Sequence, residues 1–575
     1  MKNILRGLTF YKKKIVLVFL MVIGSAMSSL ALPMYMSRVI NVAIVNEDMG
    51  MVLRIGVQML FFVILGLSCS IAMGYFAAHV SVGFSKSLRS RVFKKVQEFS
   101  QPEFDAISTS SLITRTNNDV MQIQTFVNIV LRISLMAPIM AVGGIVMALA
   151  KNVKMSMILL VAMPVMLLFI FNAARRIVPL SSKMQGRLDE INLVIREKLT
   201  GIRVARTFGT EAYEEERFEK VNRDFMENAT KLGKIMATLM PGLNLILYGT
   251  TVALMAFAGF EIVKGSLVPV GDMIAVIQYV IQIIMSVVMM SMVFLFYPRA
   301  SVSAKRIDEV LSMVPSIQNT SRELPPTEER GRVSFRSVSF TFPNANAPAL
   351  ENISFDSEPE EITAIIGSTG SGKSTLINLI PRFYDVQSGE ILVDGVNIKD
   401  MDLNVLRGKI GLVPQKAFLF KGSIRDNIAY GTSLSDEEIH HVLQIAQSEQ
   451  FVMEKEGGLD APITQGATNL SGGQKQRLAI ARAIGRKPEI YIFDDSFSAL
   501  DFKTDSALRK ALFRETENAT VILVAQRVST IKNADRIIVL ENGKIAGIGK
   551  HTELLQNCEV YREIVYSQMS EEEAR

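Results

Sequence analysis

A glycine-rich octapeptide, Gly367-Ser-Thr-Gly-Ser-Gly-Lys-Ser374, constrains the fold of this 575-residue chain more than any other feature. It directly follows the apolar run Ile362–Ile366 and precedes Thr375–Leu379, which predicts a strand, a loop and a helix in that order. Such a loop presents backbone N–H groups to the β- and γ-phosphates of a nucleotide, while Lys373 supplies a positive charge and the Ser374 hydroxyl can coordinate Mg²⁺. A chance glycine-rich turn would need neither flanking element, so we expect ATP and Mg²⁺ as ligands. The predicted nucleotide-binding residues here are Gly367, Ser368, Thr369, Gly370, Ser371, Gly372, Lys373, Ser374 and Thr375.

Six long runs without Asp, Glu, Lys or Arg occupy the N-terminal half. A hydrophobic content of 49% is too high for a purely soluble protein of this length, so part of the chain should lie in a lipid bilayer. Each run is long enough to cross a hydrocarbon core about 30 Å thick. We therefore predict a six-helix transmembrane domain over 1–313, a linker over 314–330 and a nucleotide-binding domain over 331–575. The predicted spans lie near residues 15–37, 55–85, 133–150, 155–174, 235–260 and 273–298.

Positively charged residues cluster beside these apolar runs. The net charge is +6, but this placement is typical of the cytoplasmic flanks of membrane spans and does not favour nucleic-acid binding. An even number of spans brings both termini to one side, which we expect to be the cytoplasm. Only Cys69 and Cys558 are present, so no disulfide framework is predicted.

The connections 86–132 and 175–234 are long, polar and compatible with helix, so we expect the membrane helices to continue into the cytoplasm. Each connection contains a short polar break, Ser108–Thr114 in the first and Gly209–Glu215 in the second. We interpret these breaks as transverse helices that touch the ATPase. A simple solvated helical hairpin is the alternative.

The C-terminal region should be an α/β domain with an antiparallel flank. The apolar runs Ile490–Phe493 and Val521–Val524 suit buried parallel strands, and the alternation over Val333–Phe342 suits antiparallel ones. Asp494 ends the first of these runs and should deliver a carboxylate to Mg²⁺. A capping box at Ser435–Glu438 predicts a helical insert between the phosphate loop and that strand.

The segment Leu470-Ser-Gly-Gly-Gln474 precedes a helix-forming run, Lys475–Arg486. Two adjacent glycines at a helix start form an anion site. Because the phosphate loop of this chain already binds one nucleotide, we expect the segment to meet ATP held by another subunit.

In this order and spacing, the motifs resemble those of the ATP-binding-cassette (ABC) transporters, and nearly the whole chain is similar to a half-transporter of the type I exporter fold. The resemblance implies that Phe342 stacks on adenine, that Gln415 links Mg²⁺ to the membrane domain, and that Asp501 lies at the seam between two ATPase domains. It also implies that Leu470–Gln474 is the family's signature segment, which contacts the other subunit's nucleotide through Ser471, Gly472, Gly473 and Gln474.

Two positions depart from the family pattern. The family's usual general base is a glutamate directly after the aspartate of the Walker B motif, which here is Ile490–Asp494, and that position is Asp495 in this chain. The family's usual switch histidine is replaced by Gln526. A shorter carboxylate withdraws its oxygens, and a misplacement of about 1 Å can cost on the order of a hundredfold in rate. Gln526 can donate a hydrogen bond but cannot carry a proton. ATP should therefore bind here and hydrolyse slowly.

Both departures together resemble the noncatalytic half of heterodimeric bacterial multidrug exporters. That resemblance implies a bacterial cell membrane, a second and non-identical half-transporter as partner, and export of hydrophobic drugs or lipid-like small molecules. The intact signature would then serve the partner's catalytic site. A sluggish homodimer and an ATP-gated or regulatory switch are the alternatives, whereas six spans exclude a soluble DNA-repair ATPase.

A row of methionines in the last span suggests where a substrate could bind. Met285, Met289, Met290 and Met292 lie near Gln278, Tyr279 and Gln282, and flexible thioethers suit a surface that repacks around varied apolar molecules. A lipid-facing stripe is the alternative.

Overall fold

The computed structural model describes the whole chain except residues 1, 265–268, 321–329, 344, 571 and 573–575. The described residues divide into two compact units. The helical unit contains Met1–Gln97 and Ser110–Met313, and the ATPase unit contains Glu98–Thr109 and Val314–Arg575. Most of the predicted linker, residues 321–329, lies outside the described residues.

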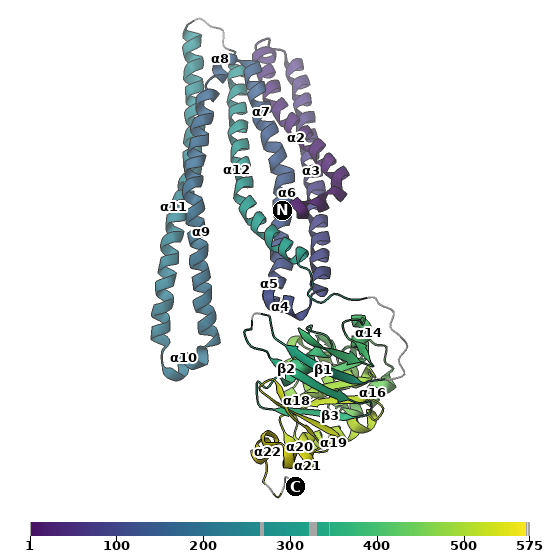
Figure 1. The fold of residues 1–575 in the computed structure, drawn as a ribbon. Coiled ribbons are helices and arrows are strands. Elements are labelled where there is room, and N and C mark those ends of the chain that lie inside the picture. The colour runs from purple at the N-terminus through teal and green to yellow at the C-terminus, as the bar shows by residue number, and fades with distance from the viewer. Residues whose placement is uncertain (1, 265–268, 321–329, 344, 571, 573–575) are drawn as a thin grey trace. The chain divides into compact units, whose positions relative to one another are not determined.

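The helical unit consists of long helices joined by short turns (Figure 1). Its elements are α1 (Lys2–Leu5), η1 (Arg6–Tyr11), α2 (Lys12–Arg38), η2 (Val39–Ile44), α3 (Met49–Gln97), α5 (Thr109–Thr114), η3 (Arg115–Asp119), α6 (Val120–Ile129), η4 (Val130–Ser134), α7 (Leu135–Lys151), α8 (Val153–Ser156), α9 (Leu159–Thr200), α10 (Ile202–Phe208), α11 (Glu211–Val263) and α12 (Val270–Ser312).

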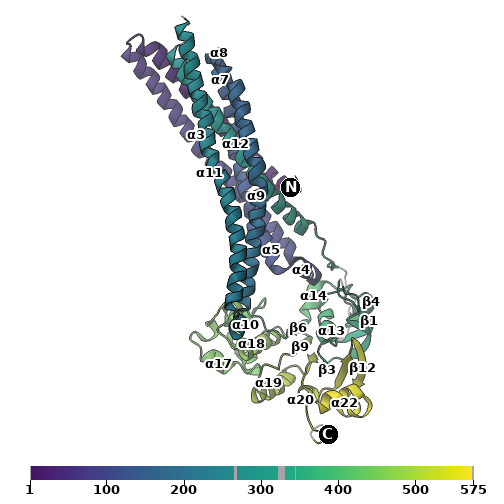
Figure 2. The same cartoon turned by 90° about the vertical axis from the view of Figure 1, so that its left-hand side faces the viewer.

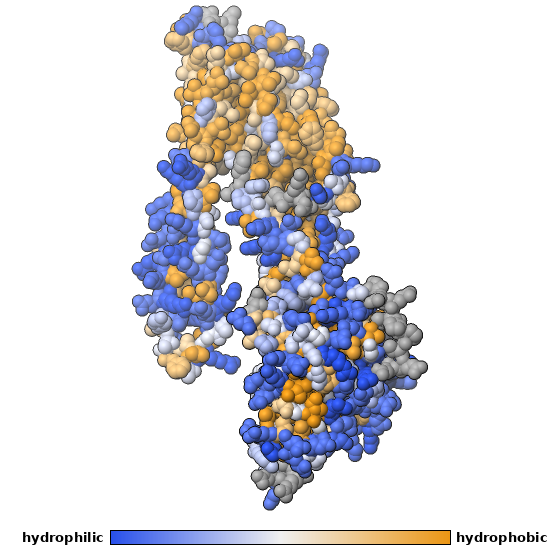
Figure 3. All heavy atoms as spheres, viewed as in Figure 1, coloured by the Kyte–Doolittle hydropathy of each residue, from blue (hydrophilic) through white to orange (hydrophobic). Residues whose placement is uncertain are grey.

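Among the described residues, six continuous helical segments are long and apolar enough to cross a membrane, which agrees with the predicted number. They are Arg6–Ile44, Met49–Gln97, Thr109–Lys151, Val153–Thr200, Glu211–Glu261 and Val270–Ser312. Figure 3 shows hydrophobic side chains gathered over the upper half of this unit and hydrophilic ones over the lower half of the α9–α11 pair. The fourth predicted span, 155–174, falls within the segment Val153–Thr200, where Asn152 caps α8 and α9 begins at Leu159.

Helices α9 and α11 run side by side over most of their length, with α10 joining them at one end (Figures 1 and 2). The predicted break at Gly209 is present: this glycine has φ 62°, ends α10 and is followed at Glu211 by α11. Ion pairs such as Arg217–Glu197, at 2.7 Å, link the two helices. Both partners are exposed, so packing rather than charge holds the pair together.

The first predicted transverse helix is displaced from its expected position. Thr109–Thr114 forms α5, whereas the helix grouped with the ATPase unit is α4, Gln101–Ile107. A capping box fixes the start of α4, because the Ser100 amide donates to Glu103 Oε2 at 2.8 Å and Pro102 lies in the first turn. The helix ends at Ile107, and the residue that caps this end, Ser108, has φ 62°.

The ATPase unit contains a six-stranded sheet of order β12-β11-β3-β10-β9-β6, parallel except for β12, and a four-stranded antiparallel sheet of order β2-β1-β4-β5. This confirms the predicted α/β class with an antiparallel flank. The strands are β1 (Val333–Phe340), β2 (Leu350–Ser357), β3 (Ile362–Gly367), β4 (Ser388–Val393), β5 (Val396–Asn397), β6 (Ile410–Val413), β7 (Gly422–Ser423), β8 (Pro462–Ile463), β9 (Ile490–Asp494), β10 (Thr520–Val524), β11 (Arg536–Glu541) and β12 (Lys544–Gly549).

Helices cover both faces of the larger sheet. They are α13 (Lys373–Leu379), α14 (Leu403–Gly408), α15 (Ile424–Ile428), α16 (Asp436–Ile445), α17 (Glu449–Met453), α18 (Gly472–Gly485), α19 (Phe502–Glu515), α20 (Val528–Ile531), α21 (His551–Asn557) and α22 (Glu559–Tyr566), with the short 3₁₀ turns η5 (Gly458–Asp460) and η6 (Gln465–Ala467). The predicted capping box at Ser435 opens α16 and is confirmed.

Alternate residues of the central strands enter opposite hydrophobic cores. Tyr491 and Phe493 of β9 pack in one buried cluster, whereas Ile490 and Ile492 pack in the other. Every residue of β9 and β10 is buried, as expected for a parallel sheet covered on both sides. The carboxyl ends of β3 and β9 therefore emerge at one edge, on either side of β10.

Candidate nucleotide-binding site

The phosphate loop connects β3 to α13. The helix begins at Lys373, two residues before the predicted start, so the lysine and Ser374 belong to its first turn. Gly370 and Gly372 have φ values of 84° and 100°, which favour glycine over other residues. A Cβ on Gly372 would also lie only 2.9 Å from the Ala349 carbonyl oxygen. The loop is thus built for backbone N–H groups to approach a phosphate closely.

Lys373 crosses the loop and donates hydrogen bonds to two of its carbonyl oxygens, Gly367 at 2.8 Å and Ser368 at 2.7 Å. Burial lowers the pKa of this lysine, while Asp494 and Asp495 act in the opposite direction. Burial raises the pKa of the Asp494 carboxyl group, because it disfavours the charged form of an acid as it does that of the lysine. The lysine and the acids at the end of β9 therefore share one partly buried, charged site.

Ser374 and Asp494 have the chemistry that Mg²⁺ requires. The Ser374 hydroxyl donates to Asp494 Oδ1 at 3.3 Å, so two hard oxygen donors lie side by side next to the loop. Mg²⁺ commonly uses one or two such protein oxygens, with phosphate oxygens and water completing its coordination. When bound, the ion would neutralise charge on the β- and γ-phosphates.

A cavity of about 540 Å³ opens beside the loop and collects most of the predicted residues. The predicted residues that line it are Phe342, Thr369, Gly370, Gly372, Lys373, Ser374, Thr375, Gln415, Asp494, Asp495 and Gln526. Gly367, Ser368 and Ser371 belong to the loop but do not line the cavity. Its donors and acids fit a Mg²⁺-bound nucleotide.

Phe342 lies just beyond the end of β1. Its ring packs edge-on against Phe340 and Tyr384, with centroids 4.9 and 5.4 Å away. A half-buried aromatic ring at the cavity wall is suited to stack on a base.

Asp495 follows β9 with φ 45°, and its backbone N–H donates to the Val524 oxygen at 2.9 Å. Its Oδ2 accepts two side-chain hydrogen bonds, from Gln526 Nε2 at 3.0 Å and from Gln415 Nε2 at 3.4 Å. Sequence reasoning assigned separate roles to these three residues but did not predict their contact. Strand pairing explains it, because Asp494 of β9 is in register with Val524 of β10.

The signature segment forms a separate surface. Ser471 caps α18, and its N–H donates to Gln474 Oε1 at 3.0 Å. The helix begins at Gly472, three residues before the predicted helix-forming run, and a Cβ built there would meet no atom within 4 Å. Asp501 caps α19 by accepting from the Thr504 N–H at 2.9 Å. None of these residues lines the phosphate-loop cavity.

The sequence matches the family described as "ABC transporter transmembrane region" over residues 15–287 and the family "ABC transporter" over residues 350–498. An uncharacterized ABC transporter ATP-binding protein of Mycobacterium tuberculosis is 38% identical over 97% of this chain and 96% of its own length. An ATP-dependent lipid A-core flippase of Chromobacterium violaceum is 30% identical over 100% of this chain and 98% of its own length. The fold is similar to a bacterial Atm1-family ABC exporter with ATP bound, with a TM-score of 0.81, 24% identity, and 97% and 99% of the two chains covered.

This chain belongs to the ABC transporters.

It is a multi-pass membrane protein with the exporter fold and an ATPase domain, and its enzyme class is that of an ATPase-coupled translocase. The structure adds a part of the cavity that sequence reasoning missed. Asn542 and Gly543 line it from the β11–β12 turn, and the Gly543 N–H donates to the Ser371 oxygen at 3.2 Å. The pair Asn-Gly between two apolar runs is a hairpin signal that could have identified this turn.

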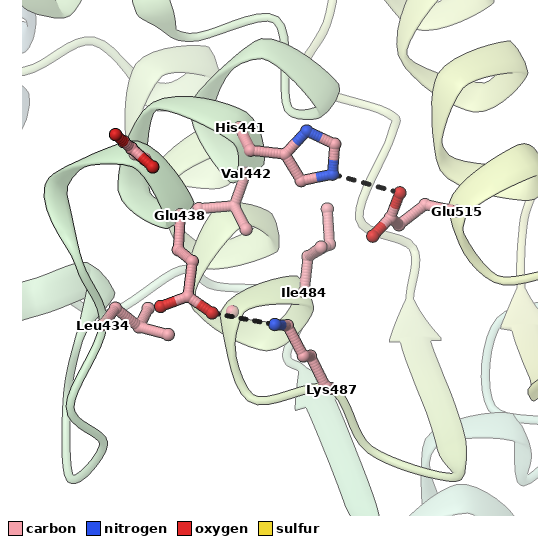
Figure 4. Close-up of a pocket in the computed structure, with 9 residues that line it drawn as sticks. Leu434, Glu438, His441, Val442, Ile484, Lys487 and Glu515 are labelled. Carbon is pink, nitrogen blue, oxygen red and sulfur yellow. Dashed lines mark hydrogen bonds and ion pairs between the residues drawn. The ribbon is translucent and has the colours of Figure 1, made fainter.

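A second hollow, of about 230 Å³, is separate from this ABC transporter site (Figure 4). His441 points toward Glu515 at 3.3 Å, and Lys487 pairs with Glu438 at 2.9 Å across its wall. Ile484, from α18, forms part of the apolar lining. No predicted nucleotide-binding residue lines this hollow, and its paired charges join α16 to neighbouring elements.

Proposed function

We propose that the chain is one half of an ATP-driven exporter and that it works beside a second, non-identical ABC half-transporter. In this arrangement its own ATP site is degenerate, and its signature completes the partner's catalytic site. The observation that carries the proposal is the hydrogen bond from Gln526 to Asp495, because it joins both departures from the family pattern in one contact.

This contact explains why hydrolysis should be slow at the site. A general base needs a carboxylate oxygen directed at the attacking water. Asp495 is one methylene shorter than glutamate, and its Oδ2 already accepts from two neutral amides. Gln526 cannot take the place of a protonatable histidine in stabilising developing charge. ATP and Mg²⁺ should therefore bind without rapid turnover.

The N-terminus of α18, in contrast, keeps the N–H donors that the partner's ATP would require. The capping box around Ser471 holds the first turn, and the first helical N–H groups have no partner within the helix. Such donors stabilise charge that develops on a transferring phosphoryl group. Gly472 has open space beyond its Cα, into which another subunit's γ-phosphate could fit.

The tip of the α9–α11 pair supports a partner as well. Val204 and Phe208 of α10 are 62% and 75% exposed, and Leu199, at the end of α9, is 68% exposed. Apolar side chains gathered at the end of a polar helical pair favour a docking role over the simple solvated hairpin. We assign this tip to the partner's ATPase domain, with both termini of the chain in the cytoplasm of a bacterial cell.

For the substrate we propose a hydrophobic or lipid-like small molecule. Met285, Met289 and Met290 are 51%, 41% and 41% exposed on α12, whereas the side chain of Met292 lies outside the described residues. Tyr279, near these methionines in the sequence, is fully buried and donates to the Leu30 oxygen at 3.0 Å, so it does not belong to the exposed surface. The lipid A-core flippases among the relatives are consistent with a lipid-like substrate.

The test compares the chain purified alone with the chain co-purified with its partner half-transporter. Alone, it should bind ATP but show little substrate-stimulated hydrolysis. Together, the two should hydrolyse ATP rapidly and move a hydrophobic dye into inside-out vesicles. A homodimer that turns over many ATP per second contradicts the proposal, and ATP hydrolysis by the pair without vesicle transport would indicate a switch instead of a pump.

A further inference from the structure

Gln568, close to the C-terminus, contacts the loop that carries Gln526. Its side-chain Oε1 accepts from the Val528 N–H at 2.8 Å, and its Nε2 donates to the Gln526 backbone oxygen, also at 2.8 Å. One side-chain amide therefore holds this loop at two points, one on either side of Arg527. Gln568 follows Gln526 by 42 positions in the sequence, and both belong to the ATPase unit.

The loop itself, residues 525–527, is an irregular connection between β10 and α20. Within the described residues, the N-cap residue of α20, Arg527, makes no side-chain capping hydrogen bond. The first N–H groups of a helix have no partner within the helix, and Val528 is the first helical residue of α20. Because Gln568 Oε1 accepts from the Val528 N–H, it takes the part of a cap from a distant segment of the chain.

Buried neighbours fix the position of Gln568. It lies two residues after α22 ends at Tyr566, and its backbone N–H donates to the Val565 oxygen at 3.0 Å. Tyr561 and Val565 of this helix are fully buried, and Met569 packs against the same core cluster. The backbone at Gln568 is therefore already ordered, which lowers the entropic cost of the two hydrogen bonds that its side chain makes to the loop.

The position of the loop matters because Gln526 lies in the wall of the phosphate-loop cavity. A side-chain amide has two N–H donors, and one of those on Gln526 donates to Asp495 Oδ2 at 3.0 Å. In the proposed function the cavity binds ATP, so the second N–H can donate to the outermost phosphate. ADP lacks that phosphate, and a contact through Gln526 would therefore favour ATP over ADP.

We propose that Gln568 is a positioning residue of this site, which holds the backbone of the loop so that the Gln526 amide faces Asp495 and the outermost phosphate of ATP. The inference rests on the proposed nucleotide site and adds a residue that favours ATP over ADP there. Gln568 lies outside the described lining of the cavity, so its effect must pass through the loop. A site that hydrolyses ATP slowly can in this way still distinguish ATP from ADP.

The test measures the affinities of the full chain in lipid nanodiscs for adenylyl imidodiphosphate and for ADP, both with Mg²⁺. This ATP analogue keeps the outermost phosphate but resists hydrolysis, so the measurement does not depend on the turnover rate of the site. The ratio of the two affinities reports the contact with the outermost phosphate, whereas a general loss of folding would lower both affinities together. Gln568→Met removes both hydrogen bonds from a side chain of similar length and should lower the ratio about fivefold, the effect of one neutral hydrogen bond.

Two further variants show whether the effect passes through the loop. Gln568→Glu keeps an acceptor for the Val528 N–H but, when ionised, has no donor for the Gln526 oxygen, so it should lower the ratio as Gln568→Met does. Gln526→Ala removes the amide itself and should lower the ratio at least as much. Adding Gln568→Met to Gln526→Ala should change the ratio no further, since both act through one contact. Gln556→Met, at an exposed position in α21, is the matched control and should leave the ratio unchanged.

An unchanged ratio in Gln568→Met or in Gln568→Glu would overturn the inference, as would a further loss in the double variant. If Gln568→Met fails to fold, which loss of ADP binding would reveal, Gln568→Glu at this exposed position decides the question. An unsubstituted chain that binds neither nucleotide would remove the proposed nucleotide site, and this inference with it. Rapid turnover by the chain alone would contradict the proposed degenerate site but would leave this test intact.

Discussion

We predict that the phosphate-loop cavity and the N-terminus of α18 both serve nucleotide, and the two surfaces differ in what they retain. The cavity keeps its binding parts, Lys373, Ser374 and Asp494, while Asp495 is short and bonded to Gln526. The signature keeps its cap, its two glycines and open space at Gly472. If the proposed function holds, the contrast separates nucleotide binding from nucleotide turnover within one chain.

The largest expected effect comes from the signature side. Gly472→Asp places a negative charge against the partner's γ-phosphate, where backbone N–H groups of α18 should donate. Loss of one N–H donor to a transferring phosphoryl group costs about a hundredfold in turnover, and we expect at least this loss. The substitution fits this chain's own fold, because a Cβ at Gly472 meets nothing within 4 Å. ATPase assays of the co-purified pair measure the loss. Gly472→Asn, equal in size and uncharged, is the control and should retain more activity than the aspartate.

Restoring the family's usual base and switch residues should raise the rate of ATP hydrolysis at the phosphate-loop cavity. In the chain purified alone, Asp495→Glu combined with Gln526→His should raise ATP turnover by about tenfold to a hundredfold, since about 1 Å of misplacement costs that much. Steady-state phosphate release measures it, with each single variant as a reference. A double variant no faster than the native chain would show that another defect limits this site.

Substitution of the phosphate-binding residue Lys373 should lower ATP affinity, whereas the changes at Asp495 and Gln526 concern the rate of hydrolysis. Lys373→Ala removes a charged contact worth about 1.5–3 kcal/mol, so ATP affinity at this site should fall about tenfold or more. Equilibrium binding of a fluorescent ATP analogue to the chain alone measures this. Lys532→Ala, on the exposed surface after α20, should leave affinity unchanged.

The smallest effect is expected at Gln526. Gln526→Ala frees Asp495 from one hydrogen bond but supplies no base, so turnover of the pair should change by less than about twofold. A loss of more than tenfold would mean that this amide takes part directly in hydrolysis.

Local patterns in the sequence were enough to predict the phosphate loop, the buried strand that ends at Asp494 and the capping box at Ser435. Each depends on neighbours in the chain, where periodicity and capping preferences act. Helix α4 also had a local signal, the capping pattern Ser100-Gln-Pro-Glu103. The prediction instead placed the transverse helix at the polar run Ser108–Thr114 that follows it.

The side-chain contacts between distant segments of the ATPase unit could not be predicted from local sequence patterns. Asp495 meets Gln526 because β9 and β10 are neighbours in register, and Tyr384 meets Asp105 across 279 residues. Both depend on how distant segments pack. The roles of Phe342, Gln415 and Asp501 came from resemblance and stay predictions, although the cavity does bring Phe342 and Gln415 together with the phosphate loop.

The most direct measurement compares the ATPase rates of Gly472→Asp and Asp495→Asn, each co-purified with the unsubstituted partner. The aspartate at Gly472 should abolish most turnover at the partner's site, whereas Asp495→Asn removes a base that is already misplaced and should leave most of it. The ratio of the two rates should be on the order of a hundredfold in favour of Asp495→Asn. If Asp495→Asn abolishes turnover while Gly472→Asp keeps it, this chain carries the catalytic site and the account is wrong.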